Sequence, residues 1–274
     1  MLVATMSSIP PRFGLIGPAL DSLLAQTRAP DRIELYIPES YRRFPDWDGA
    51  LPQVPDGVTI VRCAADLGPA TKVLYAARAY RGQDVHLLVC DDDRAYPPDL
   101  AATLLAAARA HPGAAIATRG LLADRLLGQR ARRKLRPRAL PRDPGLDLEF
   151  HLARLWCRLR HGPGAPPPRR RPFRRSGYID AFEGCGGVLL RPDFLDDAAF
   201  DIPAVAWGVD DIWLSGMLAH RGVPVWLVAN RRSPPNTGAQ ARAPLAEATI
   251  GGVARGEANR QAVRYMQATY GIWT

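Results

Sequence analysis

The chain has 274 residues, 47% hydrophobic and 23% charged, proportions that argue against a disordered chain, a collagen or a coiled coil. Its length allows one large domain or two small ones, and no apolar run of about 18 residues predicts a membrane-spanning helix. The 36 Lys and Arg exceed the 27 Asp and Glu by 9, and nearly all of this positive charge is arginine. Such a balance suits nucleic acid, anionic lipid or phosphorylated substrates, although a coding bias toward Arg and Ala explains it equally well.

Residues 1–118 alternate strand-like and helix-like segments, which predicts an α/β fold with a mostly parallel sheet. The segment 85–90 is almost continuously apolar, as expected for a central strand buried on both faces. The expected strands are 2–5, 32–37, 58–62, 85–90 and 114–118, and the expected helices are 16–26, 70–80 and 99–110.

Residues 119–177 interrupt this alternation with two arginine-rich clusters, 130–136 and 169–175. Between the clusters lie an amphipathic helical pattern at 148–160 and a Pro/Gly-rich run at 162–168 that is incompatible with regular structure. We interpret this part as a basic, partly mobile insertion over the face of the domain. Regular structure is expected to resume in 178–274, with strands at 188–190 and 224–228, helices at 210–221 and 257–270, and loops over 231–256.

The start of the chain and its cysteines predict a cytoplasmic protein. No basic region followed by an apolar run opens the sequence, so we expect no secretory signal. The four cysteines lie far apart and form no CxxC pair, which indicates reduced thiols.

Three adjacent carboxylates, Asp91, Asp92 and Asp93, follow the apolar segment 85–90. Their mutual repulsion costs stability, and a divalent cation would relieve it. Because alternate residues of an extended chain point the same way, Asp91 and Asp93 suit one site for Mg²⁺ or Mn²⁺. A bare acidic triplet is more often a solvated turn, but the buried strand before it favours a ligand site at the end of the sheet.

Two further stretches begin helices. In the segment 66–72, a Gly-Pro turn precedes a helix whose free N–H groups suit an anion, and Lys72 lies in its first turn. In the segment 207–211, an acidic pair follows Trp207, an arrangement that suits a general base beside a flat sugar-binding ring. The helix N-terminus is expected to keep this base ionised. Plain helix capping is an equally good interpretation of either stretch taken alone.

Taken in order, the motifs resemble the family-2-type glycosyltransferases of the GT-A fold, in their bacterial branch. They are Ser-Ile-Pro-Pro-Arg at 8–12, Asp-Leu-Gly-Pro-Ala-Thr-Lys at 66–72, Val-Cys-Asp-Asp-Asp-Arg-Ala-Tyr-Pro at 89–97, Gly-Cys-Gly-Gly-Val-Leu-Leu-Arg-Pro at 184–192 and Trp-Gly-Val-Asp-Asp-Ile-Trp-Leu at 207–214. The resemblance covers about residues 1–118 and 178–228. It implies a GT-A (Rossmann-like), mostly parallel central sheet with flanking helices. It also implies a nucleotide-sugar-binding half at 1–118 and, beyond the insertion, an acceptor-side half with a C-terminal helix at 178–274.

The resemblance assigns roles by position. Asp91 and Asp93 match the metal-binding DxD motif, with Asp93 the direct ligand of Mn²⁺ or Mg²⁺. The positions that match donor- or nucleotide-binding residues are Thr5, Ser7, Arg12, Asp66, Lys72, Asp91 and Asp92. In the acidic pair Asp210-Asp211, the second member matches the catalytic base of inverting enzymes. Gly186, Gly187 and Trp207 match the acceptor side. The chain departs from many GT-A enzymes in having no His after His220, so Asn230, Asn236 or water would complete the metal site.

The implied reaction is transfer of a sugar from a nucleoside diphosphate donor to a hydroxyl of a glycan or lipid-linked acceptor, in cell-surface glycan synthesis. The insertion would then rest on an anionic membrane at the inner face, close over the donor as a lid, or remain solvated. A nucleotidyltransferase is the alternative enzyme, but it would carry a Gly-rich basic loop where Ser-Ser-Ile-Pro-Pro-Arg stands. A basic RNA- or polyanion-binding module is the non-enzymatic alternative. Few aromatic residues interleave the arginines, so we expect no specific nucleic acid partner.

Overall fold

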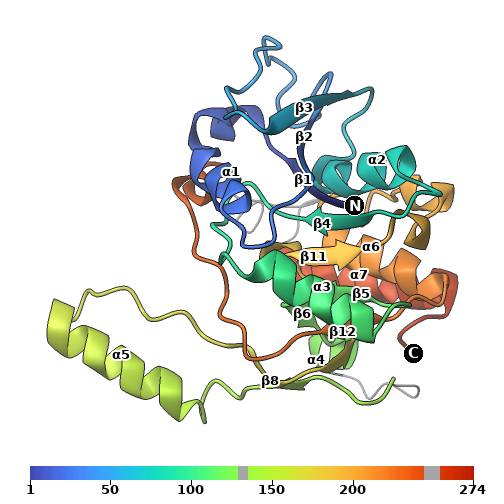
Figure 1. Ribbon diagram of the computed structural model, residues 1–274. Coiled ribbons are helices and arrows are strands. Elements are labelled where there is room, and N and C mark those ends of the chain that lie inside the picture. Colours follow the sequence, from blue (N-terminus) through green and yellow to red (C-terminus); the bar gives the residue numbers. More distant parts are fainter. Residues whose placement is uncertain (129–134, 244–253) are drawn as a thin grey trace.

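An eight-stranded mixed sheet forms the centre of the molecule (Figure 1). The computed structural model describes residues 1–128, 135–243 and 254–274. Across the sheet, the strands lie in the order β3 (Val58–Cys63), β2 (Arg32–Pro38), β1 (Leu2–Ser7), β4 (His86–Val89), β11 (Val188–Leu190), β5 (Ala115–Ala117), β12 (Val225–Leu227) and β9 (Gly177–Ile179).

Parallel pairing predominates, as the alternation of strands and helices predicts. The pairs β3–β2, β2–β1, β1–β4 and β5–β12 are parallel, whereas β11 runs antiparallel to both β4 and β5, and β9 antiparallel to β12. In β1, Leu2, Ala4 and Met6 pack into the core on one face, while Val3 joins the core on the other. The α/β fold class is therefore confirmed by the topology itself.

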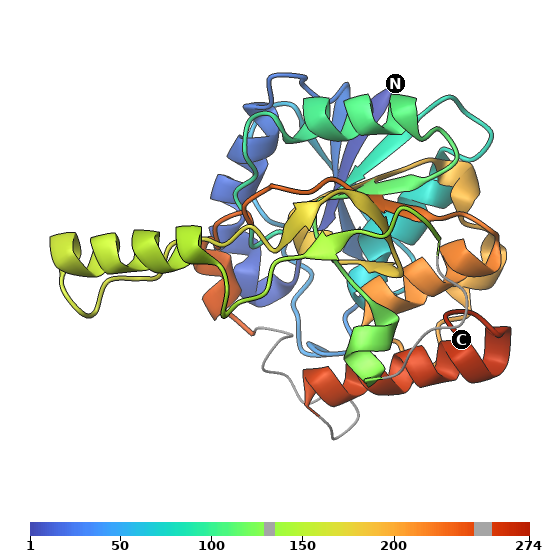
Figure 2. The same ribbon diagram turned by 90° about the horizontal axis from the view of Figure 1, so that it is seen from below.

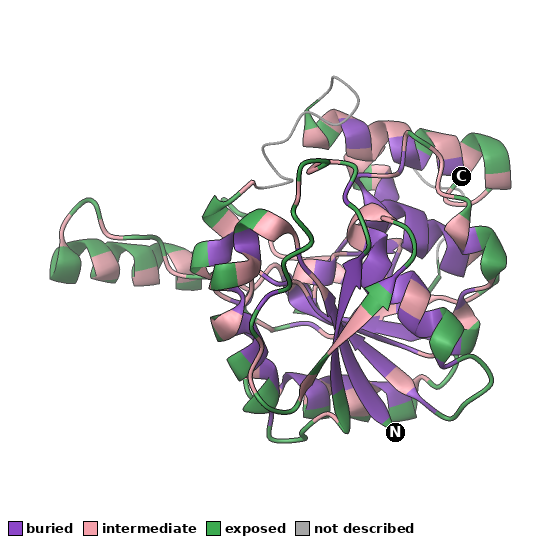
Figure 3. Ribbon diagram, turned by 90° about the horizontal axis from the view of Figure 1, so that it is seen from above, coloured by how far each residue is buried: buried purple, intermediate pink, exposed green. Residues whose placement is uncertain are grey.

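Two layers of helices cover the sheet. The helices α1 (Gly17–Leu24) and α3 (Leu100–Ala110) pack on one face. The other face is covered by α2 (Thr71–Ala79), α6 (Asp210–His220) and α7 (Arg255–Tyr270). Figure 2 shows the two layers from below, turned by 90° from Figure 1, and Figure 3 shows that burial concentrates on the strands between them. None of the helices in the described residues is both long and apolar enough to cross a bilayer.

The predicted insertion forms small elements beside the sheet and one long projection. The small elements are β6 (Gly120–Leu121), which pairs with β10 (Ala181–Phe182), α4 (Ala123–Leu127), and the pair β7 (Leu140–Pro141) and β8 (Phe173–Arg175). The amphipathic pattern forms α5 (Leu148–His161), which extends away from the body in all three ribbon views. The run 162–168 contains no helix or strand, as predicted. Most of the basic cluster 130–136 and part of the segment 231–256 lie outside the described residues.

Local boundaries differ from the prediction by a few residues. The strand expected at 2–5 continues to Ser7, because Ser7 still pairs with Tyr36 of β2. The helix expected at 70–80 begins as a 3-10 turn over Gly68–Ala70 and becomes α-helical at Thr71. The other 3-10 helices are Pro10–Leu15, Gly184–Gly186, Pro192–Phe194, Asp197–Phe200 and Gly238–Ala241.

Candidate active site

A cavity of about 360 Å³ lies where the parallel strands end and the acidic triplet begins. The expected residues that line it are Ser7, Arg12, Asp66, Lys72, the triplet Asp91, Asp92 and Asp93, then Trp207, Asp210 and Asp211. They come from four separate parts of the chain, which the sheet brings to one edge because parallel strands end together there.

The triplet leaves the sheet directly from β4. Cys90 still donates its N–H to the carbonyl of Thr5 on β1, at 2.9 Å. The N–H of Asp91 then donates to the Tyr96 hydroxyl at 2.7 Å. This tyrosine is buried behind the turn. The apolar strand and its hydroxyl anchor therefore fix the backbone from which the three carboxylates project.

Lys72 connects the triplet to the acidic pair at the start of α6. Its ammonium nitrogen lies 2.8 Å from Asp91 Oδ1 and 3.5 Å from Asp210 Oδ2. Only 5% of Lys72 is exposed. Burial by itself would lower the pKa of Lys72, but the negative charges of Asp91, Asp210 and Asp211 outweigh it and raise the pKa. The side chain is therefore a fixed cation on the cavity wall.

Asp92 points back toward the loop after β1. One of its carboxylate oxygens accepts from Ser8 Oγ at 2.5 Å, and the other accepts from the Arg12 guanidinium at 2.7 Å. Burial raises the pKa of Asp92 to about 6, against the opposing effect of Arg12. Each oxygen of Asp92 thus accepts a hydrogen bond from the loop after β1, and the side chain holds this loop in place.

Asp91 and Asp93 differ in their surroundings. Burial would raise the pKa of Asp91, but Lys72 holds it below the usual range. For Asp93, burial and the charge of Asp91 raise the pKa, despite Arg94 and Arg12 nearby. Asp93 Oδ2 lies 3.3 Å from the Arg12 guanidinium, whereas Oδ1 is buried without a hydrogen bond, 3.2 Å from Arg94 Nε.

A divalent cation fits this pair of carboxylates. Asp93 Oδ1 is buried and accepts no hydrogen bond, although it forms an ion pair with Arg94 Nε, and the repulsion between Asp91 and Asp93 would fall if both bound a cation. Within the ranges that the structure describes, no group of three or more His, Cys, Asp or Glu side chains is arranged to hold a metal. The protein would thus supply two carboxylates, and substrate oxygens and water the remaining ligands.

The proposed third protein ligands lie elsewhere. Asn230 accepts from Arg142 and donates to the carbonyl of Arg174, at the base of the insertion. Asn236 donates to Gln240. Neither asparagine lines the cavity. Asn230 thus uses both its amide oxygen and its amide nitrogen in contacts away from the cavity.

Asp211 lies at the start of α6 on the cavity wall. Its Oδ1 accepts from the N–H of Gly184 at 2.9 Å. Burial, together with the charges of Asp210 and Asp91, raises the pKa of Asp211 well above its usual range. Burial and the like charges thus act against the ionisation that the helix N-terminus is expected to favour. Asp210 does not cap the helix, whose N-cap is Val209.

Trp207 packs against the turn that precedes α2. At Gly68, which has φ of +61°, an added Cβ would lie 3.0 Å from the Trp207 carbonyl and 3.1 Å from its ring. Asp66 stabilises the same turn by accepting from the N–H groups of Gly68 and Arg42. The Arg42 guanidinium lies 5.4 Å from the centre of the Trp207 ring. These contacts fix an aromatic ring at the cavity beside Lys72.

Three of the expected residues do not reach the cavity. Thr5 is fully buried between the strands. The carbonyl of Gly186 accepts from Thr118 Oγ1, and Gly187, with φ of +82°, faces Leu100, so both glycines support the backbone behind the site. Gly184 is the member of this motif that contacts the acidic pair. In a run containing three glycines, the sequence does not show which one approaches a side chain.

The cavity also contains residues that the sequence analysis missed. Arg119 and Glu183 form an ion pair of 3.2 Å on its wall. Cys185 lies beside them, and burial raises the pKa of its thiol to about 12, so it is not a reactive thiolate. All four cysteines are unpaired, as expected. Glu183 directly precedes the Gly-Cys-Gly-Gly motif and could have been noticed, whereas nothing distinguishes Arg119 from the other arginines.

Among known proteins, only solved structures show similarity to this chain. No protein-family model and no curated protein matches the chain. Among solved structures, similarity extends to 2-C-methyl-D-erythritol 4-phosphate cytidylyltransferase (IspD) of Francisella tularensis, with TM-score 0.42, 11% identity, and coverage of 85% of this chain and 91% of that one. Residues 1–349 of S. aureus TarS are similar with a TM-score of 0.44 and 11% identity, covering 85% of this chain and 59% of that chain. A 4-diphosphocytidyl-2C-methyl-D-erythritol synthase is similar with a TM-score of 0.41 and 12% identity, covering 85% of this chain and 90% of that chain. Similarity at this level does not identify an activity for the chain.

Proposed function

We propose that this protein is a glycosyltransferase that moves a sugar from a nucleoside diphosphate donor to an acceptor hydroxyl. The observation that carries the proposal is the bridging position of Lys72. Its ammonium contacts Asp91 of the triplet and Asp210 of the acidic pair, and all three side chains line one cavity. One substrate in this cavity would therefore contact a phosphate-binding cation, a carboxylate pair for a metal and a candidate base.

The cavity suits a diphosphate on electrostatic grounds. Besides Lys72, it is lined by the guanidinium-bearing residues Arg12, Arg43, Arg94, Arg119 and Arg255. Several of these pair with carboxylates of the site, so the walls offer donors without a large unbalanced charge. A divalent cation held by Asp91 and Asp93 would supply Lewis-acid stabilisation of the leaving diphosphate. Lys72 would add a fixed positive charge to the same group.

Asp211 is the candidate base of the proposed reaction. We propose that its carboxylate accepts the proton of the acceptor hydroxyl while that oxygen bonds to the anomeric carbon of the sugar. The bond between this carbon and the diphosphate oxygen breaks, and the electron pair leaves with the diphosphate. A single displacement of this kind inverts the anomeric carbon. The raised pKa of Asp211 makes its ionised form a stronger proton acceptor than an exposed aspartate. Trp207 would face the sugar or the acceptor.

A two-part binding and transfer experiment tests the proposal. Thermal shift with nucleoside diphosphates, with and without Mn²⁺, identifies the nucleobase, since a ligand that binds the folded state raises the melting temperature. Candidate donors with that base are then incubated with glycan or lipid-linked acceptors, and the release of nucleoside diphosphate is measured. Release of pyrophosphate from a nucleoside triphosphate and a sugar phosphate would identify a nucleotidyltransferase instead. Failure of every nucleotide to shift the melting temperature would contradict both.

A further inference from the structure

The long projection of the insertion carries an exposed apolar surface. We call residues 142–172 the α5 arm; it consists of α5 and the extended segment that returns along it (Figures 1 and 2). No residue of α5 itself is buried. Large apolar side chains that remain accessible on a helix of this length mark an interaction surface.

The helix has two distinct long faces. The partly buried residues of one face are Phe150, Ala153 and Cys157, and Phe150 lies under the Arg170 guanidinium of the returning segment. The opposite face carries a stripe at intervals of three or four residues. Its members and their exposed fractions are Leu148 74%, Leu152 67%, Leu155 54%, Trp156 62% and Leu159 74%. The spacing places them along one side of an α-helix. The arm therefore covers one face of α5 by itself and leaves the apolar stripe free.

Positive charge concentrates on the same part of the chain. Residues 135–175 contain eleven arginines and three acidic residues, a net charge of +8, whereas the whole chain carries +9. The acidic side chains Asp147 and Glu149 pair with arginines within the arm. Arg154, Arg158 and Arg160 are exposed and form no ion pair within the described residues. At about 100° per residue, Arg158 and Arg160 fall on either side of the leucine stripe.

From this arrangement we propose that the α5 arm binds the surface of an anionic phospholipid bilayer, with α5 lying in the plane of the interface. A leucine stripe with a tryptophan at its edge and arginines on both flanks is the pattern that interfacial helices use. The apolar side chains enter the acyl boundary, while the guanidinium groups extend to the lipid phosphates. A second copy of the chain fits this surface poorly, because two arms, each with seven arginines and three acidic residues and a net charge of +4, would repel each other.

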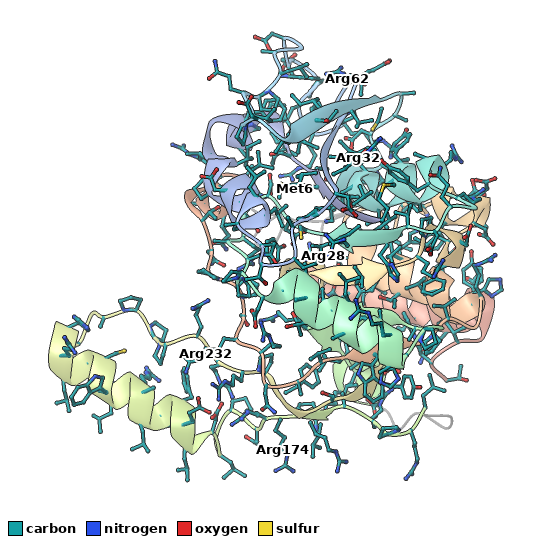
Figure 4. All side chains as sticks on the ribbon, viewed as in Figure 1. Met6, Arg28, Arg32, Arg62, Arg174 and Arg232 are labelled. Carbon is teal, nitrogen blue, oxygen red and sulfur yellow. The ribbon has the colours of Figure 1, made fainter. Side chains whose placement is uncertain are left out.

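The attachment of the arm connects this surface to the cavity. At the base of the arm, Arg232 lies 3.5 Å from Glu149, and Arg169 donates to the carbonyl of Ser233 at 3.2 Å. Arg174 and Arg232 are both near this base in Figure 4. Ser233 also lines the cavity. A bilayer bound by the arm would therefore lie near the cavity and, if the proposed function holds, would present a lipid-anchored acceptor to it.

Vesicle flotation tests the proposal with the full-length protein. Vesicles of phosphatidylglycerol and phosphatidylcholine are compared with vesicles of phosphatidylcholine alone, at low and high salt. We expect binding to the anionic vesicles only, weakened by salt.

The triple variant L152S/L155S/L159S should bind the anionic vesicles at least about tenfold more weakly than wild type, since each leucine loses its burial in lipid. R154Q/R158Q/R160Q should lose affinity and part of the salt dependence. Leu51→Ser, at an exposed leucine of the body, is the matched control and should bind like wild type.

A second measurement does not depend on the folding of the leucine variant. The fluorescence of wild type minus that of Trp156→Phe isolates Trp156, and this difference should shift to shorter wavelength when anionic vesicles are added. Absence of the shift, or equal flotation of the leucine variant and wild type, would overturn the proposal. A wild-type dimer in light scattering that the leucine variant dissociates would also overturn it, because the stripe would then join two copies. None of these outcomes depends on the proposed sugar transfer.

Discussion

Lys72 on α2 and Asp91 after β4 form a buried ion pair, with the ammonium nitrogen 2.8 Å from the carboxylate oxygen. Asp210 Oδ2 lies 3.5 Å from the same ammonium, and Asp93 interacts electrostatically with both members of the pair. A cation surrounded in this way has two functions. It offsets the repulsion among the carboxylates in the substrate-free protein, and it presents a positive charge to the cavity.

Replacing Lys72 should therefore damage both stability and binding. Lys72→Met leaves Asp91 and Asp210 without their cation, and breaking a buried pair costs about 3–5 kcal/mol of unfolding free energy. Urea denaturation measures this loss, and a nucleotide titration should show at least tenfold weaker binding. Arg78→Met, on the same helix but half exposed, is the matched control and should change stability by less than about 1 kcal/mol. A Lys72→Met protein as stable as wild type would contradict the buried-pair interpretation.

Asp93 should be needed for metal-dependent binding. Asp93→Asn removes the charge of the carboxylate that has a buried oxygen without a hydrogen bond, and it leaves the volume unchanged. We expect the gain in nucleotide affinity on adding Mn²⁺ to disappear, while binding without metal stays within about twofold. Calorimetric titration with and without Mn²⁺ makes the comparison. Asp84→Asn, at an exposed position just before β4, is the control and should keep the full gain in nucleotide affinity on adding Mn²⁺. An undiminished Mn²⁺ effect in Asp93→Asn would place the metal elsewhere.

Asp211 should be required for turnover. Asp211→Asn is expected to reduce kcat by about 10²–10⁴-fold with little change in donor affinity, as for loss of a general base. The surface variant Asp201→Asn should leave both unchanged. Unchanged turnover in Asp211→Asn would remove this residue as the base.

The same variant has a consequence for stability against pH. The pKa of Asp211 is raised in the folded protein, so the stability contributed by its protonated form is complete below about pH 4 and is lost as the pH rises toward the folded-state pKa. Asn cannot ionise, so Asp211→Asn should retain this stability at neutral pH. Melting temperatures across a pH series without metal measure the difference, and parallel curves for the two proteins would contradict it.

The sequence placed the triplet correctly because its information is local. A continuous apolar segment followed by three acids gives both the buried strand and its end. The amphipathic pattern of α5 was equally local, but its projection from the body depends on the segment that returns beside it. The bond between Lys72 and Asp91 joins different elements, so only the packing of α2 on the sheet decides it. The sequence also does not show which residue of the first strand reaches the cavity. Ser7 lines the cavity, whereas Thr5, two residues earlier, is buried between strands.

Gly184 provides a test of how accurately Asp211 is positioned. An added Cβ at this residue would lie 3.1 Å from Asp211 Oδ1 and 3.5 Å from Asp91 Oδ1, so Gly184→Ala must displace the carboxylate that accepts the Gly184 N–H. We expect kcat to fall about tenfold or more, with donor affinity nearly unchanged, because small displacements of a reacting group are costly. Gly113→Ala, where the added carbon meets nothing within 4 Å, is the control. If the effect acts through Asp211, the double variant Gly184→Ala/Asp211→Asn should be no slower than Asp211→Asn alone. Additive losses would show that Gly184 acts on another part of the site.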